Sequence, residues 1–160
     1  MLENRLPRVA IKMVQESTLI SKEVMNTPEA AVRIVCDFLK DRDREYFCIV
    51  NIRNDCRPVN MNVVSVGTIN YAIIHPREVF KSAILSNAAS IILFHNHPSG
   101  CLTPSEEDLK VTSRLQEAGS LLGIPVADHI IAGASGDYLS LKEQGIIQEN
   151  KQRLGMAAEW

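Results

Sequence analysis

Apolar and polar positions alternate along the chain in two different periods, and the contrast predicts where helices and strands lie. Residues 46–52 (YFCIVNI) form a short apolar run typical of a buried strand, and Asn54 and Asp55 supply a turn signal after it. Residues 58–66 read as the returning strand, so the two segments predict an antiparallel hairpin. A third strand is expected at 71–74.

Three segments carry apolar residues at helical spacing. The first starts at Thr27-Pro28, because threonine is a good N-cap and proline suits the first helical position. The second begins at Pro76 with Asn87 as its C-cap, and the third begins at Pro104 and ends at Gly123. Their expected buried faces are Ala31, Ile34, Val35 and Phe38; Val79, Phe80, Ala83 and Ile84; and Val111, Leu115, Ala118 and Leu122.

Shorter apolar runs complete the pattern. Residues 124–132 and 138–141 predict two more strands, separated by a turn. Near the N-terminus, Val9, Ile11 and Met13 alternate with other residues, as in a half-buried strand that forms a sheet edge or an arm packing on another subunit. The expected organisation is an N-terminal arm or strand at 1–26, one domain at 27–147, and a tail at 148–160 that is a frayed helix or a disordered end.

Length and composition narrow the class of protein. A chain of 160 residues is long enough for one domain with a sizeable hydrophobic core. The formal charge of −2 provides no dominant basic field, which disfavours direct nucleic acid binding. No apolar run is long enough to span a membrane, and no signal peptide is recognisable. The four cysteines show no CxxC spacing, so a reducing cytoplasm is the simplest setting.

Two histidines follow the apolar run that starts at residue 90. Strand side chains repeat with a period of two, so His95 and His97 point to the same face and form a natural pair of metal ligands. A helix start comes next. Thr103 suits the N-cap, Pro104 suits the first helical position, and Glu106 completes a capping box with Thr103.

Ser105 and Asp108 lie three residues apart in the first turn of that helix and share one face. Asp108 can supply a carboxylate as the third ligand. Two histidines and a carboxylate, with a fourth position left for water, are the composition of a catalytic Zn²⁺ site. An HxH pair alone is often two ordinary histidines, and NHPSG alone fits a simple turn, but the whole string favours a metal site.

The full string resembles a known family. His95-x-His97, then seven residues, then Ser105-x-x-Asp108 matches the JAMM signature of MPN-domain metalloproteases. Several separate segments in order resemble the RadC family, from about Thr27 to Ile147: GTIN at 67–70, HPREVF at 75–80, HNHPSG at 95–100, TPSEED at 103–108 and DHII at 128–131. RadC-type proteins often carry an N-terminal helix-hairpin-helix region, and the present length leaves no room for one, so a short, MPN-only member is expected.

The resemblance implies a fold and a chemistry. The fold is a single α/β domain of MPN type, with a mixed, largely antiparallel sheet and helices on both faces. The activity is Zn²⁺-dependent hydrolysis of a peptide or isopeptide bond, with His95, His97 and Asp108 as metal ligands. Glu45, just before the strand at 46–52, takes the place of the general base. Ser105 takes the place of the hydroxyl that stabilises the oxyanion.

Alternatives remain open at this stage. Glu78 competes with Glu45 as the base, although a glutamate in a first helical turn is also favoured by the helix dipole. Ser105 has an ordinary interpretation as a helix-start serine. Cys101 is an extra ligand or, more simply, a loop residue. His129 is expected to be buried and satisfied by hydrogen bonds, and His75 to be structural.

Two further function classes compete with the hydrolase. The RadC resemblance also implies a DNA-repair or mobile-element accessory protein, and a metal-bound interaction module without turnover would keep the same ligands. The expected partner of the hydrolase is a peptide or protein substrate that the sequence does not identify, and the N-terminal arm suggests a homo-oligomer.

Overall fold

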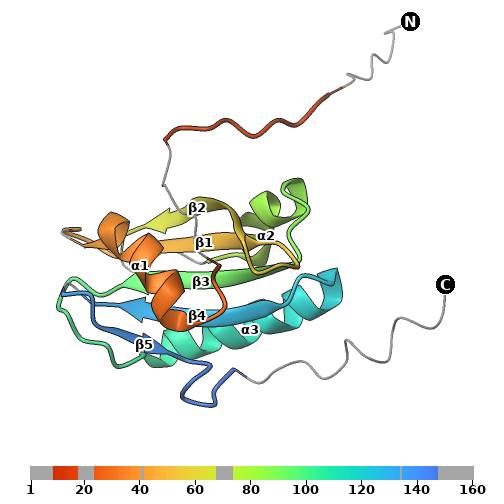
Figure 1. Ribbon diagram of the computed structural model, residues 1–160. Helices are drawn as coiled ribbons and strands as arrows, with labels where there is room; N and C mark the ends of the chain where they lie inside the picture. The colour runs from red at the N-terminus through yellow and green to blue at the C-terminus, as the bar shows by residue number, and fades with distance from the viewer. Residues whose placement is uncertain (1–8, 18–23, 41, 68–73, 134, 148–160) are drawn as a thin grey trace, which may run out of the picture.

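The computed structural model describes residues 9–17, 24–40, 42–67, 74–133 and 135–147. The tail at 148–160 lies outside the described residues, as does the strand expected at 71–74 except for Ile74. The elements, shown in Figure 1, are α1 (Pro28–Leu39), β1 (Tyr46–Ile52), β2 (Pro58–Val66), α2 (Pro76–Leu85), β3 (Ser90–Asn96), α3 (Glu106–Leu122), β4 (Val126–Ala132) and β5 (Tyr138–Ser140).

The strands form one sheet in the order β2-β1-β3-β4-β5. Strands β3 and β4 are parallel, and the other neighbours are antiparallel. Helix α1 covers one face of the sheet, and α2 and α3 cover the other (Figure 1). The predicted single α/β domain, with a mixed, largely antiparallel sheet and helices on both faces, is therefore confirmed.

Each face of the sheet has its own core. In β1, Phe47 and Ile49 pack toward α2 and α3, whereas Cys48 and Val50 pack toward α1. Because both faces are covered, the central strands are apolar throughout rather than alternating. In β3 the residues toward α3 are Ile91 and Leu93, and His95 continues this set. The period of the strand thus delivers the histidine to the α3 side.

The helix starts agree with the sequence in two cases. The Thr27 hydroxyl accepts the Ala30 N–H at 3.3 Å and Pro28 begins α1, as predicted. At the start of α2, His75 Nδ1 accepts the Arg77 N–H at 3.4 Å, which gives His75 the structural role expected for it.

The start of α3 differs from the prediction. Its N-cap is Ser105, and the capping box joins Ser105 to Asp108, so the expected box between Thr103 and Glu106 is wrong. A tertiary feature, the burial of Asp108, explains why α3 starts later than predicted. Asp108 is buried, and its carboxylate accepts the Ser105 N–H at 2.7 Å, which fixes the first turn two residues later than Pro104 would.

Two residues assigned to buried helix faces are exposed, Ile84 by 53% and Leu122 by 45%. Near the C-terminal end of α3, the buried residue is Gly119 rather than Leu122. A Cβ at Gly119 would lie 2.5 Å from the carbonyl oxygen of Ile124, so only glycine allows this close approach. In α2 the buried residues end at Ala83, and the C-cap is Ser86 rather than Asn87.

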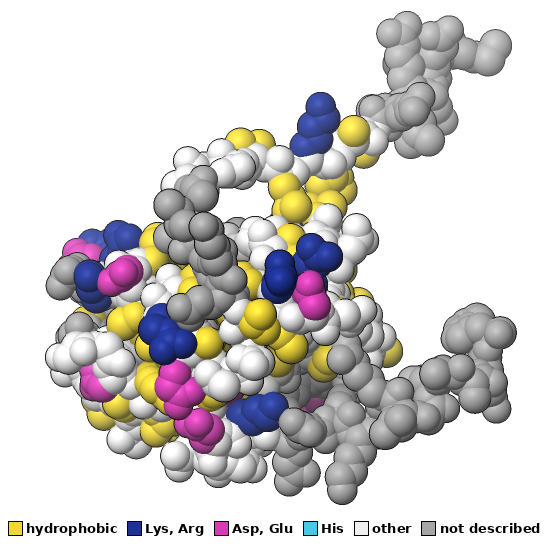
Figure 2. Space-filling view, in the orientation of Figure 1, with side chains coloured by type: hydrophobic (Ala, Val, Ile, Leu, Met, Phe, Trp, Pro, Cys, Tyr) yellow, Lys and Arg dark blue, Asp and Glu magenta, His cyan; other side chains and the backbone are white. Residues whose placement is uncertain are grey.

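Residues 9–17 are extended but pair with no strand in the described part of the chain. Val9 is 79% and Ile11 75% exposed, so the half-buried strand expected here is wrong and the segment is an arm. Figure 2 shows apolar side chains on this arm, and the Ser86 hydroxyl at the end of α2 donates to Met13 Sδ at 3.7 Å. The arm, β2 and α2 border a groove of about 1000 Å³. Packing on another subunit stays a prediction.

In the described part of the chain, none of the helices combines the length and the apolar character that crossing a membrane requires; the longest, α3, has 17 residues.

Candidate metal centre

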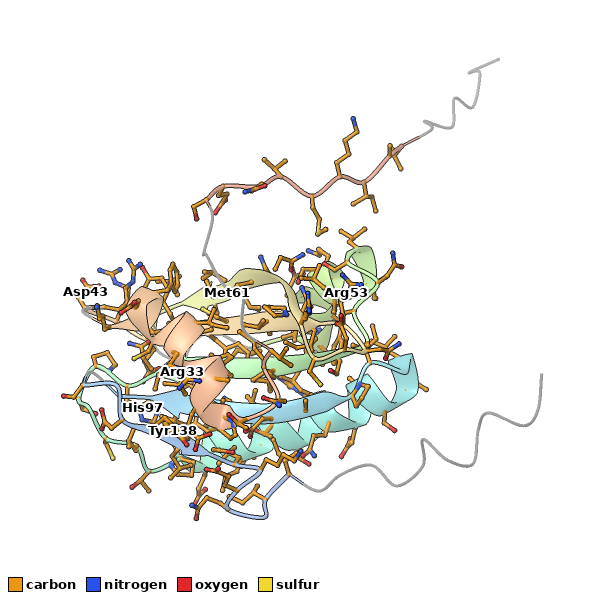
Figure 3. All side chains as sticks on the ribbon, in the orientation of Figure 1. Arg33, Asp43, Arg53, Met61, His97 and Tyr138 are labelled. Carbon is orange, nitrogen blue, oxygen red and sulfur yellow. The ribbon has the colours of Figure 1, made fainter. Side chains whose placement is uncertain are left out.

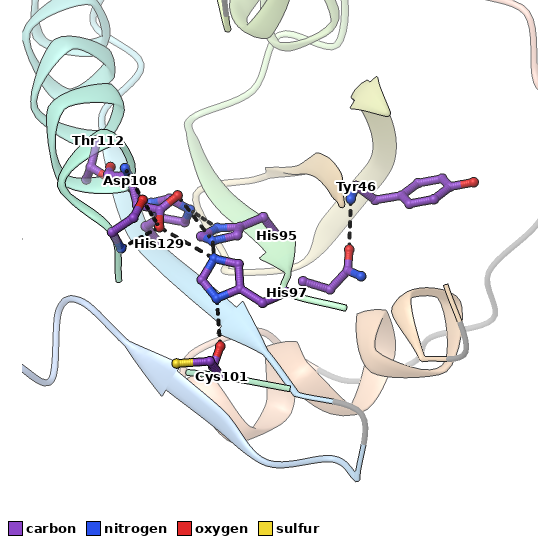
Figure 4. A network of polar contacts seen from close by, with 9 residues as sticks. Tyr46, His95, His97, Cys101, Asp108, Thr112 and His129 are labelled. Carbon is purple, nitrogen blue, oxygen red and sulfur yellow. Dashed lines mark hydrogen bonds and ion pairs between the residues drawn. The ribbon is translucent and has the colours of Figure 1, made fainter. Parts of the chain in front are cut away.

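Two elements bring the predicted ligands together. Strand β3 carries His95 and ends at Asn96, directly before His97, and the first turn of α3 brings Asp108 to the same place (Figure 4). The two Nε2 atoms lie 2.9 Å apart, and they lie 3.3 Å and 3.5 Å from the carboxylate oxygens of Asp108. Tetrahedral zinc with bonds of 2.0–2.1 Å separates its ligand atoms by about 3.3 Å. The cluster therefore has the dimensions of one small ion.

The carboxylate of Asp108 provides an independent test of this fit. Its Oδ2 accepts the backbone N–H and the hydroxyl of Ser105, both at 2.7 Å. Its Oδ1 is buried and has no hydrogen-bond partner. A buried acceptor without a donor is costly, and a cation between Oδ1 and the imidazoles would remove that cost. The residues present thus fit a metal ion.

The charge state of Asp108 also suits a ligand. Burial alone would raise the pKa of its carboxyl group, but contacts with His95 and His97, the charge of His95 and the Ser105 hydroxyl hold that pKa well below its usual range. The carboxylate therefore stays ionised at neutral pH.

His97 is oriented by the backbone of the loop that follows it. Its Nδ1 lies 2.6 Å from the Cys101 carbonyl oxygen. A carbonyl only accepts, so Nδ1 carries a proton and the Nε2 of the neutral ring offers its lone pair to the cluster. The hydrogen bond to Asp108 raises the pKa of His97 despite partial burial, and the Cys101 carbonyl, the charge of Asp108 and that of Glu45 add to this effect.

Cys101 contributes this carbonyl rather than its thiol. Among the described residues, the group that can hold a metal consists of His95, His97 and Asp108. The interpretation of Cys101 as a loop residue therefore fits, and its interpretation as an extra ligand does not.

The Nδ1 of His95, which points away from Asp108, lies against a third histidine, His129. His129, fully buried on β4, places its Nε2 2.8 Å from His95 Nδ1 and its Nδ1 2.6 Å from Thr112 Oγ1 (Figure 4). The expectation of a buried, hydrogen-bonded His129 is confirmed. The carboxylate of its neighbour Asp128 accepts the Ser140 hydroxyl at 2.6 Å and the backbone N–H of His129 at 2.7 Å, and not the His129 ring, as expected for side chains on opposite strand faces.

The contact between His129 and the candidate ligand His95 was not predicted from the sequence, and neither was any role for Thr112. One signal was available for Thr112, which follows Asp108 by four residues and so lies on the same face of α3. No comparable signal connects His129 to His95, because their proximity depends on how β3 and β4 pair.

Strand pairing places Glu45 beside the cluster. In the antiparallel register of β1 and β3, Phe47 lies opposite His95. The same register extended by two residues would bring Glu45 opposite His97, and opposed residues share a face. Glu45 is partly buried, and its charge helps to raise the pKa of His97. In Figure 3 His97 lies at the same end of the sheet as Asp43, and Arg53 lies at the other end.

The backbone around Glu45 is clamped on both sides. The Asn96 amide oxygen accepts the Tyr46 N–H at 2.8 Å, and its amide N–H donates to the Arg44 carbonyl at 3.1 Å. The carbonyl of Glu45 itself accepts the Gly67 N–H at 2.8 Å. Asn96 faces away from the ligands, as expected, but it has a function the sequence did not reveal, because it fixes the residues that flank Glu45.

Glu78 lies in a different setting. Its carboxylate, half exposed at the start of α2, bonds to Lys81 at 2.6 Å and lies 3.6 Å from Arg77. The hydrogen bond from Lys81 lowers its pKa. Glu78 also lines the groove beside the N-terminal arm. These contacts agree with the ordinary interpretation of a first-turn glutamate, and the choice of Glu45 as base stays a prediction.

Ser105 is exposed, and its hydroxyl serves the capping box. It donates to Asp108 Oδ2 at 2.7 Å and accepts the Asp108 N–H at 3.2 Å. The helix-start interpretation of Ser105 is therefore confirmed, while a contact with a substrate oxyanion stays a prediction.

Comparison with known proteins gives a consistent result. The family described as RadC-like JAB domain matches residues 25–146. A UPF0758 protein of Desulfitobacterium hafniense is 44% identical over 126 residues, which cover 79% of this chain and 55% of the relative. UPF0758 proteins of Caldanaerobacter subterraneus and Methanosarcina mazei are 46% identical over 121 residues (76% of this chain, 52% of the relative) and 41% identical over 127 residues (79% and 55%). The chain thus spans about half the length of these relatives.

Proposed function

This chain belongs to the RadC-like JAB domain family, and on that premise we propose that it is a zinc-dependent hydrolase of peptide or isopeptide bonds. His95, His97 and Asp108 would hold the zinc. The observation that carries the proposal is the buried, unpartnered Oδ1 of Asp108 beside the two imidazoles. When bound in such a site, zinc lowers the pKa of a water and polarises a substrate carbonyl.

We assign Glu45 the role of general base, which takes the proton of the attacking water. A carboxylate next to the reacting water is the usual proton acceptor in such chemistry. The strand register up to Phe47 and His95, the effect of the Glu45 charge on His97, and the clamp by Asn96 support this assignment.

We assign Ser105 the role of oxyanion donor. Its hydroxyl is exposed and would turn from Asp108 toward the negatively charged oxygen that forms on the substrate. Asp108 Oδ2 would still accept the hydrogen bond from the backbone N–H of Ser105, so this carboxylate oxygen would retain one donor.

One observation favours a second candidate. The capping box already accounts for the Ser105 hydroxyl without any catalytic use. The same ligands would then serve a metal-bound interaction module without turnover, for example an accessory protein of DNA repair.

A set of variants separates the two functions. In a hydrolase, Glu45→Gln keeps the zinc and abolishes cleavage, because the change removes the proton acceptor at nearly constant size. Ser105→Ala lowers turnover by roughly 10²–10³-fold, the scale for one oxyanion donor. Glu78→Gln is the matched control and leaves both zinc and turnover unchanged.

The measurements are zinc content, a hydrolysis screen over peptide and isopeptide substrates, and rescue of the phenotype of the gene deletion. In an interaction module, Glu45→Gln and Ser105→Ala are silent in every assay. Full rescue by Glu45→Gln would exclude the hydrolase even if the zinc site is correct.

A further inference from the structure

We propose that His129 and Thr112 form a positioning pair that sets the tautomer of His95, so that His95 Nε2 presents a lone pair to the metal. The inference rests on the proposed zinc site, and it concerns two residues that lie behind the ligands rather than among them (Figure 4).

The hydroxyl of Thr112 fixes the direction of the hydrogen bonds. It has a single proton, and Oγ1 lies 2.6 Å from the carbonyl oxygen of Asp108, which can only accept. With that proton committed, Oγ1 acts as an acceptor toward His129 Nδ1, also at 2.6 Å. The proton on the His129 ring is therefore on Nδ1.

The assignment of donors and acceptors extends from His129 to His95. The imidazole of His129 is fully buried, and in the described part of the chain its hydrogen bonds go to His95 and Thr112 rather than to a carboxylate. The ring is therefore neutral, and its Nε2 carries a lone pair. His95 Nδ1, 2.8 Å from that atom, must then donate. A neutral His95 with its proton on Nδ1 has a free lone pair on Nε2, which faces Asp108 Oδ1 at 3.3 Å.

The hydrogen bonds start at the backbone carbonyl of Asp108 and run through Thr112 and His129 to His95. The far side of the His95 ring then places Nε2 3.3 Å from the carboxylate of the same Asp108. These contacts therefore link α3, β4 and β3 around the ligand atoms. Partners behind metal-ligating histidines typically change metal affinity 10–100-fold.

Removing the Thr112 hydroxyl should release this constraint. In Thr112→Val the His129 Nδ1–H has no acceptor, so the proton can move to Nε2 and point at His95. His95 would then hold its proton on Nε2, where the metal must bind. Thr112→Ser keeps the hydroxyl and should restore the native order. Ser113→Ala, an exposed hydroxyl on the next residue, is the matched control.

The first readout is nitrogen-15 NMR of the histidine rings in metal-free protein, at one pH where the rings are neutral. The wild type, Thr112→Ser and Ser113→Ala should show His95 with its proton on Nδ1, and Thr112→Val should show the proton wholly or partly on Nε2.

The second readout is zinc affinity by competition with a chelator. Thr112→Val should weaken binding on the order of tenfold, and His129→Leu, which removes the acceptor altogether, by about 10–100-fold. If His129→Leu does not fold, Thr112→Val and Thr112→Ser still decide the question.

The outcomes separate this inference from the proposed function. A wild-type His95 with its proton on Nε2 overturns the inference. So does a Thr112→Val variant with native tautomer and native zinc affinity, and neither result removes the zinc site. Conversely, the predicted tautomers in a wild type that binds no zinc would support the positioning pair and overturn the proposed function.

Discussion

The two sides of the metal centre are built differently. The buried side consists of His95, Asp108, Thr112 and His129, each at most 1% exposed, joined by hydrogen bonds between side chains and one backbone carbonyl. The open side consists of His97 and Glu45, both partly exposed and held through the backbone. There the Cys101 carbonyl orients the imidazole, and the Asn96 clamp holds the strand around the glutamate.

The difference follows from the cost of burying polar groups. A buried polar atom must find a partner inside the protein, so the buried side is a nearly closed network whose one unpaired oxygen faces the metal position. The open side can use water and leaves room for a substrate. Changes on the buried side should therefore affect both stability and metal binding, and changes on the open side should affect function with little loss of stability.

The largest effect is expected from Asp108→Ala. The change removes a ligand and one half of the capping box of α3. Zinc content should fall to nearly none, and losing the cap should lower the free energy of unfolding by about 1 kcal/mol. Elemental analysis and denaturant unfolding measure the two effects. Native zinc content in this variant would remove Asp108 from the ligand set.

His95→Ala and His97→Ala compare the two sides directly. Both should lose zinc. In metal-free protein, His95→Ala should lower the free energy of unfolding by about 2–4 kcal/mol, because it opens a cavity and leaves His129 Nε2 without a donor. His97→Ala should cost less than about 1 kcal/mol, since its side chain is partly exposed. Equal losses in denaturant unfolding would show that the two sides do not differ.

The pH dependence of the metal-free protein should come from the open side. The pKa of His97 is raised above 6.5, chiefly by its hydrogen bond to Asp108. A raised pKa in the folded state adds stability that is full below pH 6.5 and is lost as the pH rises through the folded value. Zinc competes with this proton, so zinc affinity should rise over the same window.

Unfolding and zinc titrations at several pH values test this dependence, with His97→Gln as the comparison. That variant should lose the pH dependence of stability near neutrality. An unchanged pH profile in His97→Gln would assign the dependence to another group.

The smallest effect is expected from Gly100→Ala, which changes only the loop that carries the Cys101 carbonyl. Gly100 has φ +75°, and nothing lies within 4 Å of an added Cβ, so the cost is backbone strain of about 1 kcal/mol. A slight shift of the carbonyl should weaken zinc binding several-fold in a chelator competition. A loss as large as that of His97→Ala would mean that the loop does more than orient the ring.

Much of the fold could be predicted from periodicity alone. The bounds of β1 and β2 match the predicted strands at 46–52 and 58–66, because each is an apolar run closed by turn residues. The cluster that could hold a metal was also predictable, since a strand with period two and a first helical turn bring His95, His97 and Asp108 together.

Other features depend on tertiary contacts and were not predictable. Thr103-Pro104 has the same chemistry as the correct start at Thr27-Pro28, but the buried carboxylate of Asp108 selects Ser105 as the cap. The contact of His129 with His95 depends on the register between β3 and β4 and on the rotation of α3. A sequence pattern carries no information about either.

The proposed function requires a metal held between the two sides, so zinc content is the decisive measurement. Wild-type protein purified without added metal should contain one zinc per chain by elemental analysis. The double variant His95→Ala/His97→Ala should contain none, and Glu78→Gln should match the wild type. Zinc retained in the double variant, at the wild-type level, would contradict the central claim.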